Sequence, residues 1–82
     1  LRSEHLHIAL REFGVDQKSN LIGKTLAETE IRQRSGATVL AIRSRDGSFN
    51  LQPVGSSRIE PDDTLITIGT QEQLELLEKM IG

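Results

Sequence analysis

Apolar residues alternate with less apolar ones near the start of the chain, and this alternation predicts a β-strand. The aliphatic set consists of Leu6, Ile8 and Leu10. Because a period of two places such a set on one face of a strand, we expect a half-buried strand with these three side chains turned toward the core. Gly14 and the polar run 16–20 predict the end of this strand.

A short amphipathic helix is predicted over residues 26–35. Thr25 precedes it and is a good N-cap, because its hydroxyl group can accept a hydrogen bond from an N–H group of the first turn. Gly36 predicts the end of the helix, since glycine readily adopts the left-handed conformation that closes a helix. The residues expected to face the core are Leu26, Ala27 and Ile31.

The middle of the chain predicts a β-hairpin. Residues 38–45 are apolar on both faces at their centre, which is typical of an inner strand. Asp46-Gly47 follows and predicts a type I′ turn, in which both central residues have positive φ. The return strand, 48–52, is expected to be short and to lie at an edge, because Pro53 cannot donate a hydrogen bond to a neighbouring strand. The inward-facing residues of this strand are expected to be Phe49 and Leu51.

The chain closes with a strand and a second helix. Residues 64–69 are rich in leucine and isoleucine and predict the last strand. Thr70 and Gln73 have the spacing of a capping box, in which each side chain bonds to the backbone N–H group of the other residue. The helix that they open carries its apolar stripe at Leu74, Leu77 and Ile81.

The order of elements is therefore strand, helix, strand, strand, strand, helix. This order predicts an α+β fold, a small mixed β-sheet of about four strands with two helices. At 82 residues the chain is a single domain near the lower end of what one core supports, so burial against a second copy would add stability. Because the chain begins with Leu1 rather than methionine, we expect residues 1–82 to be a fragment of a larger protein.

Composition excludes several classes of function. The net charge is −2 and the aromatic residues are Phe13 and Phe49 alone, so the chain lacks the basic face and stacking aromatics typical of nucleic-acid-binding proteins. No apolar run approaches the roughly 20 residues that a membrane span requires. The absence of cysteine excludes disulfides and thiolate metal sites. We therefore expect neither binding to nucleic acid nor direct insertion into a membrane.

Two groups of residues are candidate metal ligands, and the pattern favours neither. His5 and His7 point to one face of the first strand, but a zinc site needs a third and usually a fourth ligand, and the spacing marks none. Glu60, Asp62 and Asp63 lack the spaced ligands and the glycine of a calcium loop. Aspartate after proline is ordinary turn chemistry, so we predict a turn and no metal site.

Two further groups of residues are candidate anion-binding sites. The run 55–58, Gly-Ser-Ser-Arg, offers backbone amides and a guanidinium group to a phosphate, but it lacks the spacing and the following helix of a phosphate loop, which favours a surface turn. Four arginines could converge into a basic patch that binds an anionic ligand: Arg32, Arg34, Arg43 and Arg45. The pattern favours another interpretation, in which the first two compensate the dipole of the helix and the last two lie on a solvated face of the strand. No serine or threonine is placed beside an activating histidine, so we predict no catalytic residue and no enzyme.

An ordered series of motifs extends over nearly the whole chain. It consists of Leu21-Ile22-Gly23-Lys24-Thr25-Leu26-Ala27-Glu28, Ile31-Arg32, Gly36-Ala37, Val39 to Arg43, Asp46-Gly47, Pro53, Pro61-Asp62-Asp63-Thr64-Leu65 and Ile68-Gly69-Thr70 before the final helix. This series strongly resembles the C-terminal domain of regulator-of-potassium-conductance proteins (RCK_C), also called the TrkA C-terminal domain. Most of the matched positions are core or turn residues, so the order of the motifs carries the resemblance.

The resemblance implies a regulatory domain that senses a ligand or gates a potassium channel or transporter. Such domains are cytosolic, are associated with the inner face of the membrane through the parent protein, and pair as homodimers. A membrane channel or transporter subunit would be the partner, in cis or in trans. In some members cyclic di-AMP binds in the dimer cleft, and the resemblance places the ligand-binding positions at Leu26, Ala27, Arg32, Thr38 and Pro53. Arg32 would pair with a phosphate or stack on a base, between apolar walls.

Two positions depart from the pattern of the family. Thr38 stands where binders of this dinucleotide tend to carry asparagine, so one amide contact to the ligand would be lost. Asp62 stands where the family usually has glycine. The alternative function is therefore a purely structural dimerisation module of another membrane transporter, without a small-molecule ligand.

Overall fold

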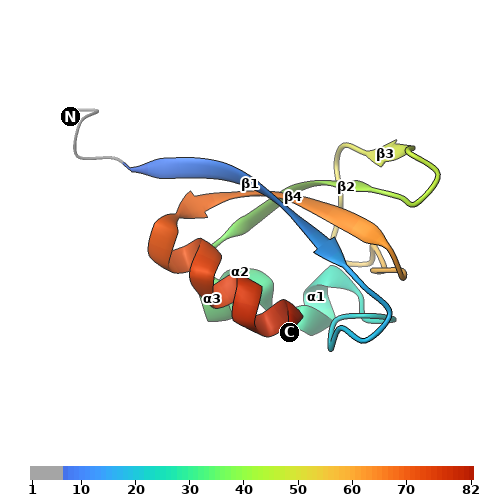
Figure 1. Cartoon of the computed structure of the whole chain (residues 1–82), viewed down its shortest axis with the longest axis horizontal. Coiled ribbons are helices and arrows are strands. Elements are labelled where there is room, and N and C mark those ends of the chain that lie inside the picture. The colour runs from blue at the N-terminus through green and yellow to red at the C-terminus, as the bar shows by residue number, and fades with distance from the viewer. Residues whose placement is uncertain (1–6) are drawn as a thin grey trace.

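The computed structural model describes residues 7–82, so the predictions on His5 and Leu6 fall outside the described residues. The strands are β1 (Ile8–Val15), β2 (Thr38–Arg43), β3 (Phe49–Asn50) and β4 (Asp63–Thr70), and the helices are α1 (Leu26–Thr29), α2 (Ile31–Ser35) and α3 (Gln71–Ile81). Figure 1 shows the helices gathered on one side of the sheet. The predicted α+β class and the predicted order of elements are confirmed, with the first helix divided in two.

The sheet has the strand order β1-β4-β2-β3 and is antiparallel at every pairing, so the prediction of a mixed sheet is wrong in this detail. The reason is topological. β1 and β2 run in the same direction, but β4 lies between them and is antiparallel to both. Parallel neighbours would have required β1 and β2 to pair directly.

The core lies between the sheet and the helices. Residues of β4 alternate between buried and half-buried along its length, which places Leu65 and Thr67 on the inner face. Thr67 is buried without an unmet polar group, because its hydroxyl donates to the backbone oxygen of Arg11 at 2.8 Å. The buried apolar side chains that pack together are Phe13, Val15, Leu21, Ile31, Ala37, Ile42, Ile59, Leu65, Leu74, Leu77 and Ile81. The predicted apolar stripe of the last helix is thus confirmed.

The first strand buries the opposite set of residues from the one predicted. Ile8 and Leu10 are 56% and 61% exposed, and the strand continues past Gly14. Its buried side chains are Phe13 and Val15, near its C-terminal end. A period of two defines two faces of a strand but does not say which face the helices cover. In the register with β4, Phe13 lies opposite the buried Leu65 and is therefore on the covered face.

The predicted helix over residues 26–35 is interrupted at Glu30, whose backbone is left-handed with φ 54° and ψ 33°. Ile31 is buried and Leu26 packs against the core, whereas Ala27 is exposed, contrary to the prediction. Both end signals are confirmed, since the Thr25 hydroxyl accepts the Glu28 N–H and Gly36 has φ 83°. The left-handed Glu30 ends α1 and begins α2, so a single helical periodicity does not run from Leu26 to Ser35.

The hairpin forms where it was predicted, but with a different turn. Gly47 has φ 90°, whereas Asp46 is not among the residues with positive φ. The Gly47 N–H donates to the Ser44 oxygen, which is the pattern of a type I turn followed by a left-handed residue. β3 is reduced to two residues, and Phe49 and Leu51 are 52% and 71% exposed rather than inward-facing. Phe49 lies opposite Arg43, which in turn lies opposite the half-buried Thr64 of β4, so its ring is on the side of the sheet away from the core.

Candidate functional site

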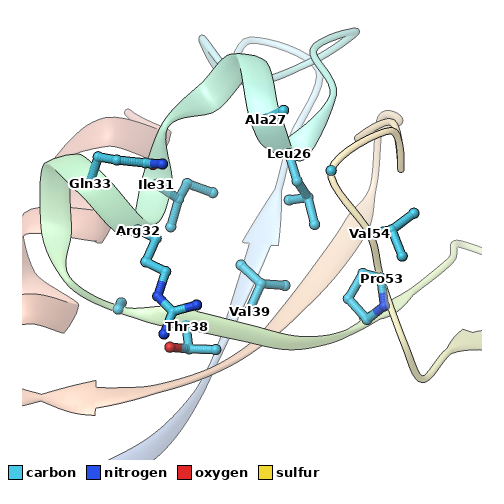
Figure 2. A pocket seen from close by; sticks show the side chains of 11 residues that line it. Leu26, Ala27, Ile31, Arg32, Gln33, Thr38, Val39, Pro53 and Val54 are labelled. Carbon is cyan, nitrogen blue, oxygen red and sulfur yellow. The ribbon is translucent and has the colours of Figure 1, made fainter.

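A pocket of about 370 Å³ lies where α1, α2, the start of β2 and the segment after β3 meet (Figure 2). All five residues to which the resemblance assigned a ligand line it, although they come from four separate parts of the chain. They are Leu26, Ala27, Arg32, Thr38 and Pro53. The structure thus brings the predicted positions together around one cavity.

Further residues line the same pocket and were not predicted. They are Ile31, Gln33, Ala37, Val39, Val54 and Gly55. Val39 follows Thr38, and in Figure 2 its side chain lies between those of Leu26 and Thr38. A β-bulge between Val39 and Ala41 disturbs the register of β2. A bulge of this kind redirects side chains, and simple alternation along the sequence gives no signal for it.

Backbone hydrogen bonds fix the two sides of the pocket to each other. The N–H groups of Leu26 and Ala27 donate to the oxygens of Ser57 and Gly55, each at 2.9 Å. The first turn of α1 therefore finds carbonyl partners in the segment that carries Pro53, and this segment cannot move away without breaking both bonds. The two apolar walls are preorganised, which lowers the entropic cost of binding a ligand between them.

A capping box holds the start of α1. The Glu28 carboxylate accepts the Thr25 N–H at 2.8 Å, and the Thr25 hydroxyl accepts the Glu28 N–H at 3.2 Å. The backbone hydrogen bond from Thr25 lowers the pKa of Glu28, and the Thr25 side chain and the charges of Arg58 and Lys24 lower it further. Glu28 is thus an acceptor committed to the helix end, and it does not line the pocket.

Among residues 7–82, Arg32 is the one cationic residue that lines the pocket. In Figure 2 its side chain extends from α2 toward the hydroxyl group of Thr38. No ion pair joins Arg32 to a residue between 7 and 82. Because a guanidinium group offers a rigid fork of donors, an exposed arginine next to a hydroxyl group suits a phosphate or carboxylate. The apolar walls beside it suit a flat ring system.

One edge of β2 is open beside the pocket. β2 pairs with β4 along its length but with β3 only at Ile42 and Arg43. Over the described part of the chain, the backbone of residues 38–40 therefore has no strand partner on the side away from β4. Unpaired edge groups are ready to bond a ligand or another strand.

The other candidate groups have structural roles. Asp63 accepts the Glu60 N–H at 2.8 Å within the predicted turn. Arg58 donates to the Gly23 oxygen, and the Ser57 hydroxyl accepts the Val54 N–H at 3.0 Å, so this run is bound to the fold rather than open to a phosphate. Within residues 7–82 no group of three or more potential ligands could hold a metal ion.

Three of the four arginines, Arg32, Arg43 and Arg45, do not converge. Arg43 donates to Glu12 at 2.9 Å, whereas Arg45 lies 3.9 Å from Asp62 and Arg32 lines the pocket. These partners lie on three different parts of the fold. The expectation that the arginines do not converge into one basic patch is therefore supported for Arg32, Arg43 and Arg45.

Comparison with known proteins gives a consistent result. The TrkA-C domain family matches residues 10–82. "Probable potassium channel protein 2" of Methanocaldococcus jannaschii is 36% identical over 74 residues, which are 90% of this chain and 21% of that protein. The "K(+)/H(+) antiporter subunit KhtT" of Bacillus subtilis is 37% identical over 65 residues, 79% of this chain and 39% of that protein. The chain thus spans between about a fifth and two fifths of these relatives.

Solved structures share the fold. The RCK_C domain dimer of S. agalactiae BusR in complex with c-di-AMP has a TM-score of 0.82 at 27% identity, over 92% of this chain and 91% of that one. The RCK C domain of the potassium transport protein KtrA, also in complex with c-di-AMP, has a TM-score of 0.77 at 28% identity, over 88% and 81%. BusR has also been solved with its busA-promotor DNA, and there this chain matches 40% of the protein.

The described helices are too short and too polar to cross a membrane.

Proposed function

The chain belongs to the TrkA-C domain family, and from this premise we propose that it is a ligand-sensing module of a potassium channel or transporter. It dimerises and binds a small anionic ligand of the cyclic di-AMP type in the cleft between two copies. The observation that carries the proposal is the convergence of Leu26, Ala27, Arg32, Thr38 and Pro53 on one preorganised pocket. The potassium-transport relatives and the c-di-AMP complexes of similar domains support it.

The chemistry of the pocket fits one half of a cyclic dinucleotide. An adenine ring is flat and apolar on its faces, and it would lie against Leu26, Val39 and Pro53. The phosphate would accept hydrogen bonds from the Arg32 guanidinium, with the Thr38 hydroxyl beside it. A ligand with two identical halves needs two identical pockets, which a two-fold dimer supplies.

Dimerisation is supported by the open edge of β2. This edge borders the pocket, so a second copy placed there would cover unpaired backbone groups and close the cavity at the same time. The small size of the domain favours the same arrangement, because a short chain buries too little apolar surface to be very stable alone. Localisation at the cytoplasmic face of the membrane, through the parent protein, is part of the proposal.

Calorimetric titration with cyclic di-AMP tests the ligand. We expect saturable binding to the wild-type chain, and Arg32→Ala is expected to weaken it by about tenfold to a hundredfold, because a hydrogen bond to a charged group contributes about 1.5–3 kcal/mol. Arg34→Ala is the matched control, since Arg34 lies on the same short helix but does not line the pocket. Equal losses for both variants would remove Arg32 from the site.

A purely structural dimerisation module is the second candidate. Thr38 favours it, because a hydroxyl group offers the ligand fewer hydrogen bonds than the asparagine that the resemblance leads one to expect. Sedimentation separates the two functions. A stable dimer that shows no heat with cyclic di-AMP, with nucleotides or with divalent cations would establish the structural role, and a monomer at all concentrations would contradict both.

The module itself is expected to bind no nucleic acid. Its net charge is −2, which gives no electrostatic attraction to phosphate backbones. The BusR complex with DNA is compatible with this expectation, because more than half of that protein lies outside the part that this chain matches.

A further inference from the structure

The wall of the pocket that carries Pro53 and Val54 lies outside the hydrophobic core. Val54 and the nearby Leu51 are 60% and 71% exposed, and Pro53 is half-buried. None of residues 51–57 belongs to the cluster of buried side chains that pack together. In Figure 2 this wall lies across the pocket from Arg32. Because little apolar surface is buried here, the position of the wall depends on polar contacts.

Ser57 makes the side-chain contacts that hold this wall. Its hydroxyl oxygen accepts the Val54 N–H at 3.0 Å and the side-chain amide of Asn50 at 3.3 Å. These two donors lie on either side of Pro53 in the chain, so a single oxygen atom joins the residues that flank it. The Asn50 side chain also accepts the Gln52 N–H at 3.3 Å. The Ser57 hydroxyl group therefore closes the loop that carries Pro53.

The backbone of Ser57 is itself fixed to the segment that begins α1. Its carbonyl oxygen accepts the Leu26 N–H at 2.9 Å. Arg58, the next residue, forms an isolated β-bridge with Thr25. Ile59 follows and is fully buried. Ser57 is thus a firmly held residue, and its side chain reaches from this anchor to an exposed part of the loop.

We propose that Ser57 is a positioning residue of the ligand pocket, a role that rests on the proposed function. Ser57 does not itself line the pocket, so it acts through Pro53 and Val54, which do. Its hydroxyl group sets the position of these two residues and hence the width of the pocket between them and Leu26. A wall that is in place before binding loses less conformational entropy when a flat ring enters. The hydroxyl group thus raises the affinity without a contact to the ligand.

A merely structural role of Ser57 makes a different prediction. Ser57→Ala removes the two side-chain contacts but keeps the backbone bonds, in which the Ser57 oxygen accepts from Leu26 and the Ser57 N–H donates to the Val54 oxygen at 2.9 Å. Water can replace the lost partner of the exposed Val54 N–H, so the free energy of unfolding should change little. A positioning role therefore lowers the affinity at nearly constant stability, whereas a structural role lowers the stability and leaves the affinity of the folded chain unchanged.

Calorimetric titration with cyclic di-AMP, together with urea denaturation, separates these roles. We expect Ser57→Ala to weaken binding about threefold to tenfold, the effect of one ordinary hydrogen bond that orders the wall. Ser57→Thr is expected to restore the affinity, because threonine keeps the hydroxyl group. Wild-type affinity for Ser57→Ala, or a loss of stability with no loss of affinity, overturns the proposal.

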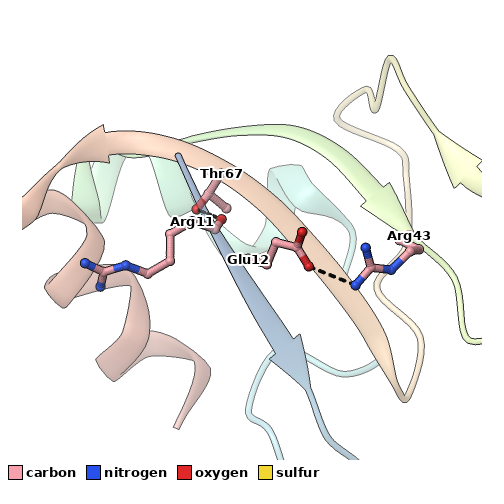
Figure 3. A network of polar contacts seen from close by, with 4 residues as sticks. All are labelled: Arg11, Glu12, Arg43 and Thr67. Carbon is pink, nitrogen blue, oxygen red and sulfur yellow. Dashed lines mark hydrogen bonds and ion pairs between the residues drawn. The ribbon is translucent and has the colours of Figure 1, made fainter. Parts of the chain in front are cut away.

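Glu12→Ala is the matched control variant. Arg43 of β2 donates to the Glu12 carboxylate of β1 at 2.9 Å, and the contact extends across β4 (Figure 3). This contact is exposed and joins distant segments, as the Ser57 contacts do, but neither of its residues lines the pocket. We therefore expect Glu12→Ala to bind cyclic di-AMP as the wild type does. Equal losses of affinity for Glu12→Ala and Ser57→Ala would remove the special role of Ser57.

Amide hydrogen exchange at Val54, measured by NMR, gives a readout that does not need the ligand. The Ser57 hydroxyl accepts this N–H, so Ser57→Ala should speed its exchange with water and Ser57→Thr should not. The Ala27 N–H is the internal control, because it donates to the Gly55 oxygen and should exchange equally in all variants. Equal exchange of Val54 in the wild type and in Ser57→Ala overturns the inference. A wild-type chain that bound no cyclic di-AMP would refute the proposed function instead, and exchange at Val54 would then still decide whether Ser57 positions the wall.

Discussion

Gly36 ends α2 and lies against Gln73 in the first turn of α3, so replacing it tests the packing of these two helices. Its φ is 83°, and a Cβ atom built on it would lie 2.7 Å from Nε2 and 3.1 Å from Cδ of Gln73. Gln73 is not free to move away, since its Oε1 accepts the Thr70 N–H at 2.9 Å and completes the capping box of α3. Gly36→Ala therefore imposes backbone strain and also displaces a helix cap.

The two costs can be estimated separately. A left-handed backbone costs a residue with a Cβ atom about 1–2 kcal/mol. Loss of the Gln73 hydrogen bond costs about 0.5–1.5 kcal/mol. We expect Gly36→Ala to lower the free energy of unfolding by about 1.5–3.5 kcal/mol, which for a domain of this size is a decrease in Tm on the order of 10–20 °C.

Urea denaturation followed by far-UV circular dichroism measures this loss, and a double-mutant cycle divides it. In a Gln73→Ala background the steric contact is gone, so Gly36→Ala should then cost only the backbone strain, about 1–2 kcal/mol. The coupling between the two positions is the part of the loss that acts through α3. A cost below about 0.5 kcal/mol for Gly36→Ala alone, or the same cost in both backgrounds, would refute this account of the junction.

Two further predictions concern positions where the local chemistry is simple. Asp62 has φ 67° and an exposed side chain 3.9 Å from Arg45, so Asp62→Gly is expected to relieve strain and to raise stability by up to about 1 kcal/mol in thermal unfolding, and a clear loss of stability would contradict this. The pKa of Glu28 is lowered because the Thr25 N–H and hydroxyl groups favour its charged form. Its contribution to the free energy of unfolding is therefore fully present above the usual pKa of a glutamate, and it is lost as the pH falls through the lowered pKa of the folded state. Glu28→Gln should therefore flatten this part of the acid dependence of denaturant unfolding, and an unchanged pH profile would count against the capping role.

The sites of turns and helix ends follow from local chemistry, and the sequence predicted most of them. Thr25, Gly36 and Thr70 each bound a helix, and a turn forms at Asp46-Gly47. These signals act within a few residues, through one side-chain hydrogen bond or one left-handed residue, so the rest of the fold need not be known. The position of the turn was predicted correctly, but its type was not. Both a type I′ turn and a type I turn with a bulge use glycine at this position, so the glycine alone does not distinguish them.

The candidate site shows a mixed result. The resemblance selected five positions, and the structure places all five around one cavity, but Ile31, Val39 and Val54 were missed. Ile31 follows the helix break at Glu30, Val39 lies at the bulge in β2, and Val54 lies in the loop after β3. Neither the break nor the bulge was predicted from the local sequence.

The sequence alone specified the order of the elements, most of the helix ends and the class of the fold, because periodicity, caps and turns are properties of a few neighbouring residues. Only the tertiary structure decided which face of each strand is covered. Ile8, Leu10 and Phe49 have the pattern of buried residues and remain exposed, since burial depends on where the helices come to lie. The same dependence on distant segments brought the residues of the pocket together.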